Sequence, residues 1–453
     1  MSRLSYTQAK RFIFSREFFG MKLGLENILE YLEELGNPER KFKSVHIAGT
    51  NGKGSTAAMI ASIFRAQGYK TGLYTSPHLV DFRERIQIDG KKITERAVVS
   101  FITAQKKELQ KRKLTFFELV TALALDYFAK EKIDVAVIET GLGGRLDATN
   151  VLSPNLTITT DIDFDHTEIL GRTVRKISRE KAGIIKSGTP HLAGLLPTEA
   201  VKIIAEICRE KDSPFYELNR NDLKLNVNQM SVGFAENGYR FADIRPALYG
   251  PHQLSNTALV LKAASIFRNN GLYVSKKAII DGIVNTDWPG RFQILTALGR
   301  PTIVLDVAHN TGGIRAFAES FKIRFPNRRG RFLCGFVQKK NHQSIFDTLN
   351  KIAEEFALAP LRTKRTAEPK ELAKVIDFRE KPVKCFGSLG AGLSYLTKKA
   401  DFDDIICVVG SHYLVGEFLE KFGAKWPGRQ ENRTKSFKRR LHRRPRPKIR
   451  PKY

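Results

Sequence analysis

Short apolar runs alternate along the chain with stretches in which apolar residues recur at helical spacing. The runs Val45–Ala48, Lys132–Thr140 and Asn155–Asp161 each predict a buried strand. Residues Leu23–Leu35 and Ser255–Asn269 predict helices. Strands that alternate with helices are typical of a mostly parallel sheet with helices on its faces. The pattern therefore predicts an α/β fold.

A second alternation of the same kind begins at Pro301. Before it, Tyr216–Ile244 predicts short antiparallel strands, and Asp287–Arg291 predicts a hinge because a Pro-Gly pair interrupts regular structure. Four further strands are predicted beyond Pro301, at residues 302–309, 331–337, 382–388 and 404–410. The chain is therefore predicted to hold two α/β domains, one at residues 1–290 and a doubly wound, Rossmann-like one at 291–425.

Positive charge is concentrated at the end of the chain. The 453 residues carry a formal net charge of +29, and Arg429–Tyr453 contributes +11 of it, with twelve Lys or Arg and one acid. Residues 426–453 are predicted to be a disordered basic tail, which either binds RNA, DNA or another polyanion weakly or has no partner. The remaining +18 suits anionic ligands such as nucleotides and polycarboxylates, and equally nonspecific contact with nucleic acid.

Composition argues against a membrane-spanning helix and against a disulfide scaffold. No apolar run approaches the ~18 residues that a span needs, and the N-terminal MSRLSYTQAKRFIF has no apolar core of a secretory signal. The cysteines are far apart without metal-ligand spacing, which predicts reduced, buried thiols in a cytoplasmic protein. They are Cys208, Cys334, Cys385 and Cys407.

The segment Ser44–Phe64, SVHIAGTNGKGSTAAMIASIF, predicts a strand, a glycine-rich turn and a helix in succession. Backbone N–H groups and the positive end of the helix would face an anion there, and Lys53 would add a point charge. The loop departs from the usual P-loop, because only two residues separate Gly49 from Gly52 and Gly54 follows the lysine. The alternative is a glycine-rich turn that binds no ligand.

This loop, GTNGKGS, resembles the ATP loop of the Mur ligase superfamily, and most closely that of the folylpolyglutamate synthase and dihydrofolate synthase family. The resemblance covers roughly residues 20–425. Further matching segments follow in the family's order: TSPHLVDFRERIQIDG, TFFELVTALAL, ETGLGGRLDATN, DHTEILGRT, REKAGIIKSGTP, GPHQLSNTALV, DWPGRF, LDVAHN and VVGSHYLVGE. It implies a Mur-ligase-type ATPase domain, which also carries the folate side, followed by a glutamate-ligase domain.

The resemblance implies ATP-dependent ligation of L-glutamate to a pteroate or folate carboxylate through an acyl phosphate, with release of ADP and phosphate. The acceptor stays open between dihydropteroate, which gives dihydrofolate, and tetrahydrofolate, which gives the polyglutamate. The protein is expected to act as a monomer. A rival from another class is a P-loop protein that binds nucleic acid through its basic surface and tail; it predicts nucleotide turnover stimulated by nucleic acid.

Candidate ligands for two Mg²⁺ ions come mostly from strand ends. Glu139 ends an apolar run just before a glycine turn, where ligand sites of α/β sheets form. The resemblance makes Glu139, Ser76 and His166 metal ligands. It also implies that Lys181 is carbamylated by CO₂ and so becomes a carboxylate-like ligand, which requires a lowered pKa. The alternative is an ordinary lysine that pairs with phosphate or with Glu180.

The remaining nucleotide contacts implied by the resemblance bridge the two domains. Asn256 would lie near adenine, Arg291 would reach a phosphate and Asp306 the ribose. The ATP loop itself comprises Gly49, Thr50, Asn51, Gly52, Lys53, Gly54 and Ser55. The residues expected to act in catalysis are Lys53, Lys181 and His309.

Two further groups are expected to bind the other substrates. His309 and Ser411, at strand ends of the second domain, would help to hold the incoming glutamate. The residues that match pterin-side positions are Thr115, Phe116, Phe117, Glu118, Leu146, Asp147 and Ala148. Phe116 and Phe117 could stack on a pterin, although two phenylalanines before an apolar helix also suit a core.

One loop departs from the family pattern. Where the family commonly shows Asp-Lys-Asp, this chain has Lys339, Lys340 and Asn341. Lys340 keeps the cation, but both acids are gone, so no role beyond positive charge is assigned to this loop.

Overall fold

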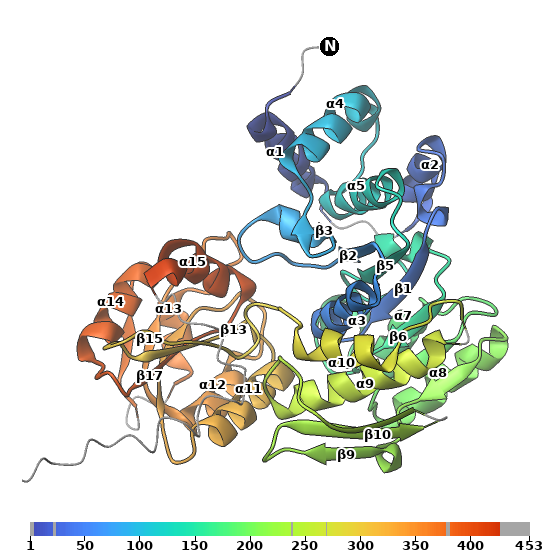
Figure 1. The fold of residues 1–453 in the computed structure, drawn as a ribbon. Helices are drawn as coiled ribbons and strands as arrows, with labels where there is room; N and C mark the ends of the chain where they lie inside the picture. Colours follow the sequence, from blue (N-terminus) through green and yellow to red (C-terminus); the bar gives the residue numbers. More distant parts are fainter. Residues whose placement is uncertain (1–3, 21–23, 237–238, 269, 377–380, 426–453) are drawn as a thin grey trace, which may run out of the picture.

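The computed structural model describes residues 4–20, 24–236, 239–268, 270–376 and 381–425 (Figure 1). An eight-stranded sheet forms the centre of the first part of the chain, in the order β4-β3-β2-β5-β1-β6-β7-β8. Its strands are β1 (Lys43–Ala48), β2 (Thr71–Tyr74), β3 (Ile86–Ile88), β4 (Lys91–Lys92), β5 (Val135–Glu139), β6 (Leu156–Thr159), β7 (His191–Ala193) and β8 (Phe215–Glu217). The neighbouring pairs along β2-β5-β1-β6-β7-β8 are all parallel, as predicted. The pairs β2–β3 and β3–β4 are antiparallel.

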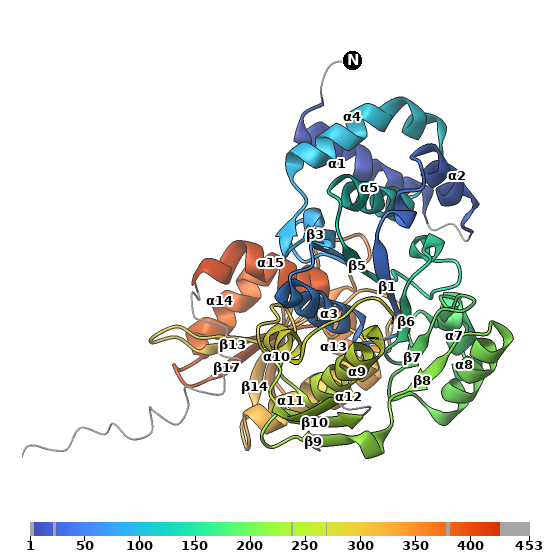
Figure 2. The same ribbon diagram turned by 45° about the vertical axis from the view of Figure 1, so that its right-hand side comes forward.

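The alternation along β5 shows how this sheet is buried on both faces. Val135 and Val137 belong to one apolar cluster, whereas Ala136 and Ile138 belong to another, because successive side chains of a strand point to opposite faces. The first cluster is covered by α3 (Lys53–Gln67), α9 (Pro251–Phe267) and α10 (Lys276–Val284). The second is covered by α1 (Tyr6–Ser15), α2 (Glu26–Glu34), α4 (Glu95–Lys111) and α5 (Phe116–Lys130), seen together at the top of Figures 1 and 2.

The segment predicted to hold antiparallel strands does so in part. Strands β9 (Leu223–Asn226), β10 (Ser231–Glu236) and β11 (Tyr239–Ile244) form a separate antiparallel sheet that packs on α9. The beginning of the segment differs, because β8 joins the large sheet as a parallel edge strand. The remaining helices of this part are α6 (Thr167–Leu170), α7 (Val174–Ala182) and α8 (Thr198–Glu210).

The second part of the chain folds around a six-stranded sheet, in the order β12-β13-β17-β14-β15-β16. Its strands are β12 (Gln293–Leu295), β13 (Thr302–Asp306), β14 (Gly330–Cys334), β15 (Ala353–Leu358), β16 (Val383–Cys385) and β17 (Ile405–Val409). All pairs except β12–β13 are parallel. One face is covered by α11 (Thr311–Arg324), α12 (His342–Asn350) and α13 (Pro369–Lys374), and the other by α14 (Leu389–Lys399) and α15 (His412–Phe422).

Strand β15 was missed by the sequence pattern because acids interrupt it. Glu355 is nevertheless buried in this strand. Its carboxylate pairs with Arg331 and accepts hydrogen bonds from Lys399 Nζ and Tyr395 Oη, each at 3.0 Å. A buried charge of this kind is tolerated because every partner is supplied by the fold.

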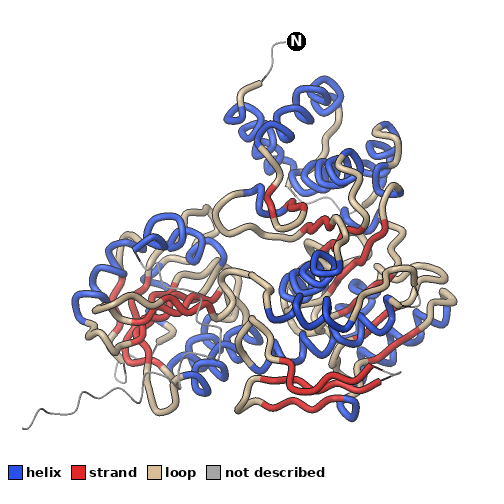
Figure 3. The backbone as a smooth tube through the Cα atoms, in the orientation of Figure 1, coloured by secondary structure: helices blue, strands red, loops and turns tan. Residues whose placement is uncertain are grey.

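The two sheets lie side by side and are joined through the segment before β12, as the strands in Figure 3 show. Short 3₁₀ helices complete the description: η1 (Arg16–Phe19), η2 (Pro38–Arg40), η3 (Phe82–Arg85), η4 (Ala148–Val151), η5 (Arg220–Asp222) and η6 (Gly423–Lys425). Within the described ranges, no helix is long and apolar enough to cross a membrane. All four cysteines are free, as predicted; three are buried, but Cys385 is exposed, so its predicted burial is wrong.

Candidate active site

The glycine loop between β1 and α3 has the close backbone approach that a phosphate cradle needs. Gly49 and Gly52 have φ angles of +152° and +82°, which other residues rarely adopt. A Cβ atom at Gly49 would lie 2.0 Å from Thr160 Oγ1, and one at Gly52 would lie 2.6 Å from Asn256 Oδ1. Helix α3 begins at Lys53, so its free N–H groups open toward the same space.

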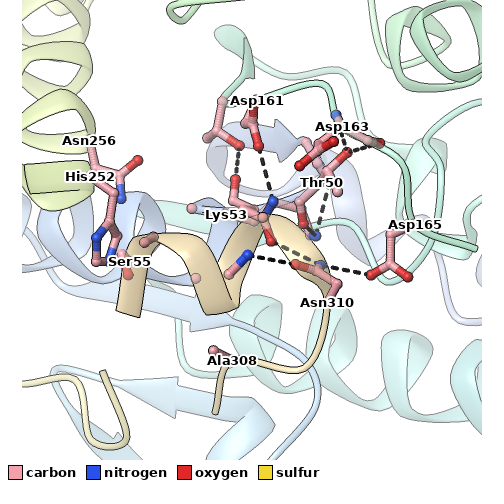
Figure 4. Close-up of a pocket in the computed structure, with 18 of the residues that line it drawn as sticks. Thr50, Lys53, Ser55, Asp161, Asp163, Asp165, His252, Asn256, Ala308 and Asn310 are labelled. Atoms are coloured by element: carbon pink, nitrogen blue, oxygen red, sulfur yellow. Dashed lines mark hydrogen bonds between the residues drawn. The ribbon is translucent and has the colours of Figure 1, made fainter. Parts of the chain in front are cut away.

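The shape of the glycine loop is held by hydrogen bonds within the loop and by a residue that follows β6. Lys53 Nζ donates to the carbonyl oxygens of Gly49 and Thr50, at 3.0 and 3.1 Å. Asp161, which follows β6, accepts from Asn51 Nδ2 at 3.1 Å through its carboxylate and from the Thr50 N–H at 2.9 Å through its carbonyl. Figure 4 shows Thr50, Lys53 and Asp161 close to one another in this pocket. The anion-binding shape is therefore built before any ligand arrives.

Lys181 approaches this loop from α7. Its side chain is 3% exposed, and its Nζ donates to the carbonyl oxygen of Gly49 at 2.7 Å. Burial and the charge of Lys53 lower the pKa of Lys181 to about 7. A lysine amine in this position is partly neutral near physiological pH.

Glu139 reaches the same cavity from the end of β5. The side chain is buried, and burial raises the pKa of its carboxyl group. One carboxylate oxygen accepts from the Ser76 N–H at 3.1 Å. The positive charges of Lys53 and Arg291 act to lower the same pKa. A buried carboxylate among cations at a phosphate loop suits a hard divalent cation.

The second part of the chain closes the cavity through Asn310. This residue caps the start of α11 with its Oδ1, while its Nδ2 donates to Asn51 Oδ1 at 3.1 Å and to Asp165 Oδ2 at 3.0 Å. Lys340 Nζ pairs with the other oxygen of Asp165 at 2.5 Å. Burial alone would raise the pKa of Asp165, but Lys340, His166 and His309 together hold it well below its usual range. The Lys339–Asn341 loop thus contributes a direct contact across the cleft.

Residues near the hinge complete this wall. The carboxylate of Asp306 accepts from the N–H groups of Phe292 and Ala308, each at 2.8 Å, and burial raises its pKa to about 6. His309 Nδ1 lies 2.9 Å from the carbonyl oxygen of Val307, which leaves Nε2 toward Asp165. Contacts with backbone groups near the end of β13 hold both side chains in position.

A cavity of about 540 Å³ collects these groups from both parts of the chain. The predicted site residues that line it are Gly49, Thr50, Asn51, Gly52, Lys53, Gly54, Ser55, Ser76, Glu139, His166, Lys181, Asn256, Arg291, Asp306 and His309. Sequence reasoning missed Asp161, Asp163, Gln253 and Asn310 as further lining residues. Asn310 and Gln253 lie inside matched segments, whereas the two acids carried only the weak signal of following a strand.

The predicted pterin-side residues and Ser411 do not line this cavity. Thr115 and Glu118 form a capping box at the start of α5, and Ser411 caps α15. Phe116 packs 5.2 Å from the ring of Phe14. The others outside the lining are Phe117, Leu146, Asp147 and Ala148. Local structure accounts for their positions, and their predicted roles stay predictions.

The described side chains of this site do not by themselves form a complete set of metal ligands. Among the residues that the structure describes, no three His, Cys, Asp or Glu side chains gather around a common point that could hold a metal ion. Glu139 and His166 nevertheless face one cavity beside the phosphate loop. Their arrangement fits a cation whose remaining ligands are phosphate oxygens and water, as is usual for Mg²⁺.

Comparison with known proteins places this geometry in a family. Residues 47–264 match the Mur ligase middle domain, and residues 290–412 match the Mur ligase glutamate ligase domain. The dihydrofolate synthase/folylpolyglutamate synthase of Bacillus subtilis is 33% identical over 429 residues, covering 92% of this chain and 99% of the relative. The chain belongs to the dihydrofolate synthase/folylpolyglutamate synthase family. Its predicted fold class and its class as an ATP-dependent ligase are thereby confirmed.

Solved structures of the same family agree with this assignment. Escherichia coli FolC in complex with DHPP and ADP is 30% identical, with a TM-score of 0.83 over 93% of this chain and 99% of that chain. A bifunctional folylpolyglutamate synthase/dihydrofolate synthase with Mn, AMPPNP and L-glutamate bound is 28% identical, with a TM-score of 0.81 over 92% of this chain and 99% of that chain. These relatives are named as folylpolyglutamate and dihydrofolate synthases, and none of this supports the alternative of a P-loop protein that binds nucleic acid.

Proposed function

We propose that this protein ligates L-glutamate to the carboxylate of a pteroate or folate, using ATP. The observation that carries the proposal is the convergence of the glycine loop, Glu139, Lys181 and Asn310 on one cavity between the two sheets. The relatives named above support the substrate classes, because they are named for dihydrofolate and folylpolyglutamate synthesis and have been seen with ADP, DHPP and L-glutamate.

The reaction balances as two group transfers. The acceptor carboxylate attacks the γ-phosphorus of ATP, so that the bond to the β–γ bridging oxygen breaks, and ADP leaves. The amine of glutamate then attacks the acyl carbon, phosphate leaves with the C–O electron pair, and the amine loses a proton. Lys53 and Arg291 would stabilise charge on the transferring group. Asn310 and Lys340, which bridge the cleft, would exclude the water that hydrolyses an acyl phosphate.

We assign the divalent cation to Glu139, Ser76 and His166, with Lys181 at a second position. When bound, Mg²⁺ would neutralise the charge of the phosphate oxygens. The chain itself supplies a buried carboxylate whose free oxygen has no described hydrogen-bond donor, and a serine whose backbone orients that carboxylate. Carbamylation of Lys181 is supported by its burial and lowered pKa, because a neutral amine is the form that reacts with CO₂.

The other predicted roles follow from the same proposal. Asn256 would contact adenine, Asp306 the ribose, and His309 with Ser411 the incoming glutamate. The pterin would lie against Phe116 and Phe117 on the folate side. Residues 1–290 and 291–425 would be the two domains, which the separate sheets and the two family matches support.

Three predictions reach beyond the described residues or the comparisons. The tail at residues 426–453 lies outside the described residues, and its weak binding of polyanions is proposed on charge alone. The monomeric state and the cytoplasmic location likewise stay predictions. The acceptor stays open between dihydropteroate and tetrahydrofolate.

Phosphate release from ATP tests the function directly. Release should require both L-glutamate and a reduced pteroate or folate, and each acceptor should be assayed separately. Equal release with UDP-linked muramyl substrates would place the protein in another Mur ligase branch. Full activity without a pteridine would contradict the proposal.

A further inference from the structure

Arg85, at the end of η3, is a buried guanidinium without an anion. Its side chain is 9% exposed, and its Nε donates to Nδ1 of His78 at 2.9 Å. Among the described residues, no carboxylate lies within ion-pair distance of Arg85, and its two Nη atoms make no hydrogen bond. The Nη atoms are not sealed in either, because neither is among the enclosed polar atoms that lack a partner.

Arg83, two residues earlier in the same 3₁₀ helix, shows the ordinary arrangement. Its guanidinium pairs with Asp81 at 2.6 Å and with Glu95 at 3.5 Å. Buried charges in proteins are normally paired in this way, because an isolated buried ion is costly. Burial lowers the pKa of Arg85, which is the mark of that cost. An arginine kept at such a cost is suited to an anion that comes from outside the chain.

Arg85 lines no cavity itself, but its partner His78 lines one that adjoins the ATP cavity and that also holds Glu84 and Asp287. His78, Arg291 and His412 line a second cavity of about 320 Å³, and Arg291 and His412 also line the ATP cavity. Burial, and then the nearby Arg85, lower the pKa of His78 to about 3, so its ring is neutral. The charges of Tyr74, Tyr413, Glu139 and Glu17 act on the pKa of Arg85, but neither glutamate forms an ion pair with it. Among the described residues the guanidinium of Arg85 thus has no acid in ion-pair contact, and only His78 separates it from a cavity that adjoins the ATP site.

We propose that Arg85, oriented by His78, is a carboxylate-binding subsite for a substrate of the ligation reaction. His78 occupies Nε, so the guanidinium presents its two Nη atoms end-on, in the fork that matches the two oxygens of a carboxylate. The guanidinium carbon also lies 5.2 Å from the centroid of the Phe116 ring, a cation–π contact. This inference rests on the proposed function.

Two substrates of that reaction could supply the carboxylate. One is the incoming glutamate. The other is the glutamyl group already present on a folate acceptor, which a pteroate acceptor lacks. Steady-state kinetics with both acceptors separates them, using Arg85→Met, Arg85→Lys and the control Arg83→Met.

Arg85→Met should raise one KM by about tenfold to a hundredfold, since it removes a charge-assisted pair, and should leave the KM for ATP unchanged. If the glutamate substrate is bound, its KM rises with both acceptors. If the acceptor is bound, only the KM of the folate acceptor rises. Arg85→Lys should recover part of the loss, and Arg83→Met should behave as the wild type. Unchanged KM values for glutamate and both acceptors would overturn the subsite.

Thermal unfolding separates binding from folding. Arg85→Met should keep or raise the Tm of the ligand-free protein, because it removes an unpaired buried charge. L-glutamate or the folate acceptor, added without ATP, should raise the Tm of the wild type but not of Arg85→Met. A wild type that shows this shift yet forms no amide would contradict the proposed function alone. A wild type that neither carboxylate stabilises, or a variant with lowered Tm and an unchanged shift, would overturn the subsite.

Discussion

The ammonium nitrogen of Lys181 lies 2.7 Å from the carbonyl oxygen of Gly49, the residue that opens the phosphate loop. A helix that is remote in sequence thus delivers a second lysine to the cradle that already holds Lys53. The two like charges and the burial of Lys181 favour its neutral amine. This contact is the structural basis for expecting unusual lysine chemistry at the site.

Lys181→Ala should be nearly inactive in ligation, because it removes the proposed carbamate ligand. A small carboxylate such as acetate should restore part of the activity, since it can occupy the vacated position. Lys176→Ala, which removes an exposed lysine from the same helix, is the matched control. Full wild-type activity in enzyme prepared free of CO₂ would instead favour an unmodified lysine.

The free energy of unfolding should increase with pH because of Lys181. Its pKa falls from 10.5 to about 7 on folding, so between these values the unfolded chain holds a proton that the folded chain has released. The free energy of unfolding should therefore rise with pH across this window, by up to ~1.4 kcal/mol per pH unit. Below about pH 7 both states are protonated and this dependence disappears. Urea unfolding in CO₂-free buffer measures it, and Lys181→Met should lack this component.

Lys53→Ala should lower turnover by about a hundredfold or more, because it removes a cation aimed at the transferring phosphate. The loop should also lose the two hydrogen bonds that Lys53 makes to its carbonyl oxygens. The variant Lys70→Ala serves as the control, since the side chain of that lysine is partly exposed and its ammonium group contacts the backbone and the carboxylate of Glu131. Turnover close to that of the wild type at saturating substrates would show that the role given to Lys53 is wrong.

Glu139→Gln should require a higher Mg²⁺ concentration for half-maximal activity and lower the maximal rate. The glutamine oxygen can still accept from the Ser76 N–H, and the buried negative charge is lost, so folding should not suffer. Activity titrated against Mg²⁺, with Glu131→Gln as the control, measures the effect. An unaltered Mg²⁺ dependence would remove Glu139 from the metal site.

A truncation after Gly428 should leave ligation unchanged and should weaken retention on a polyanion column at low salt. Phosphate contacts made by Arg and Lys depend strongly on salt, so the difference should vanish as salt rises. Loss of ligation would mean that the tail belongs to the active fold. Unchanged retention would assign polyanion binding to the +18 of the rest of the chain.

Local patterns predicted most of the fold because they depend on neighbouring residues. The parallel strands β1, β5, β6, β13 and β17 were predicted from apolar runs, and the glycine loop from its own composition. Strand β15 was missed because a glutamate such as Glu355 is expected to be exposed. It is buried here because the fold supplies Arg331 and Lys399, which are not its neighbours in the sequence, as ion-pair partners. Short strands such as β7 carry too few residues for a pattern.

The sequence by itself determined the succession of elements, the anion-binding loop and the family, because strand, turn and helix signals are local and the matched segments keep their order. Only the tertiary structure decided which side chains meet. It brings Lys181 to Gly49 across 132 residues, joins Asn310 to Asn51, and leaves Arg85 buried without an anion. The reason is physical: the pKa of a lysine and the charge of a subsite depend on burial and on neighbours that spacing along the chain does not reveal.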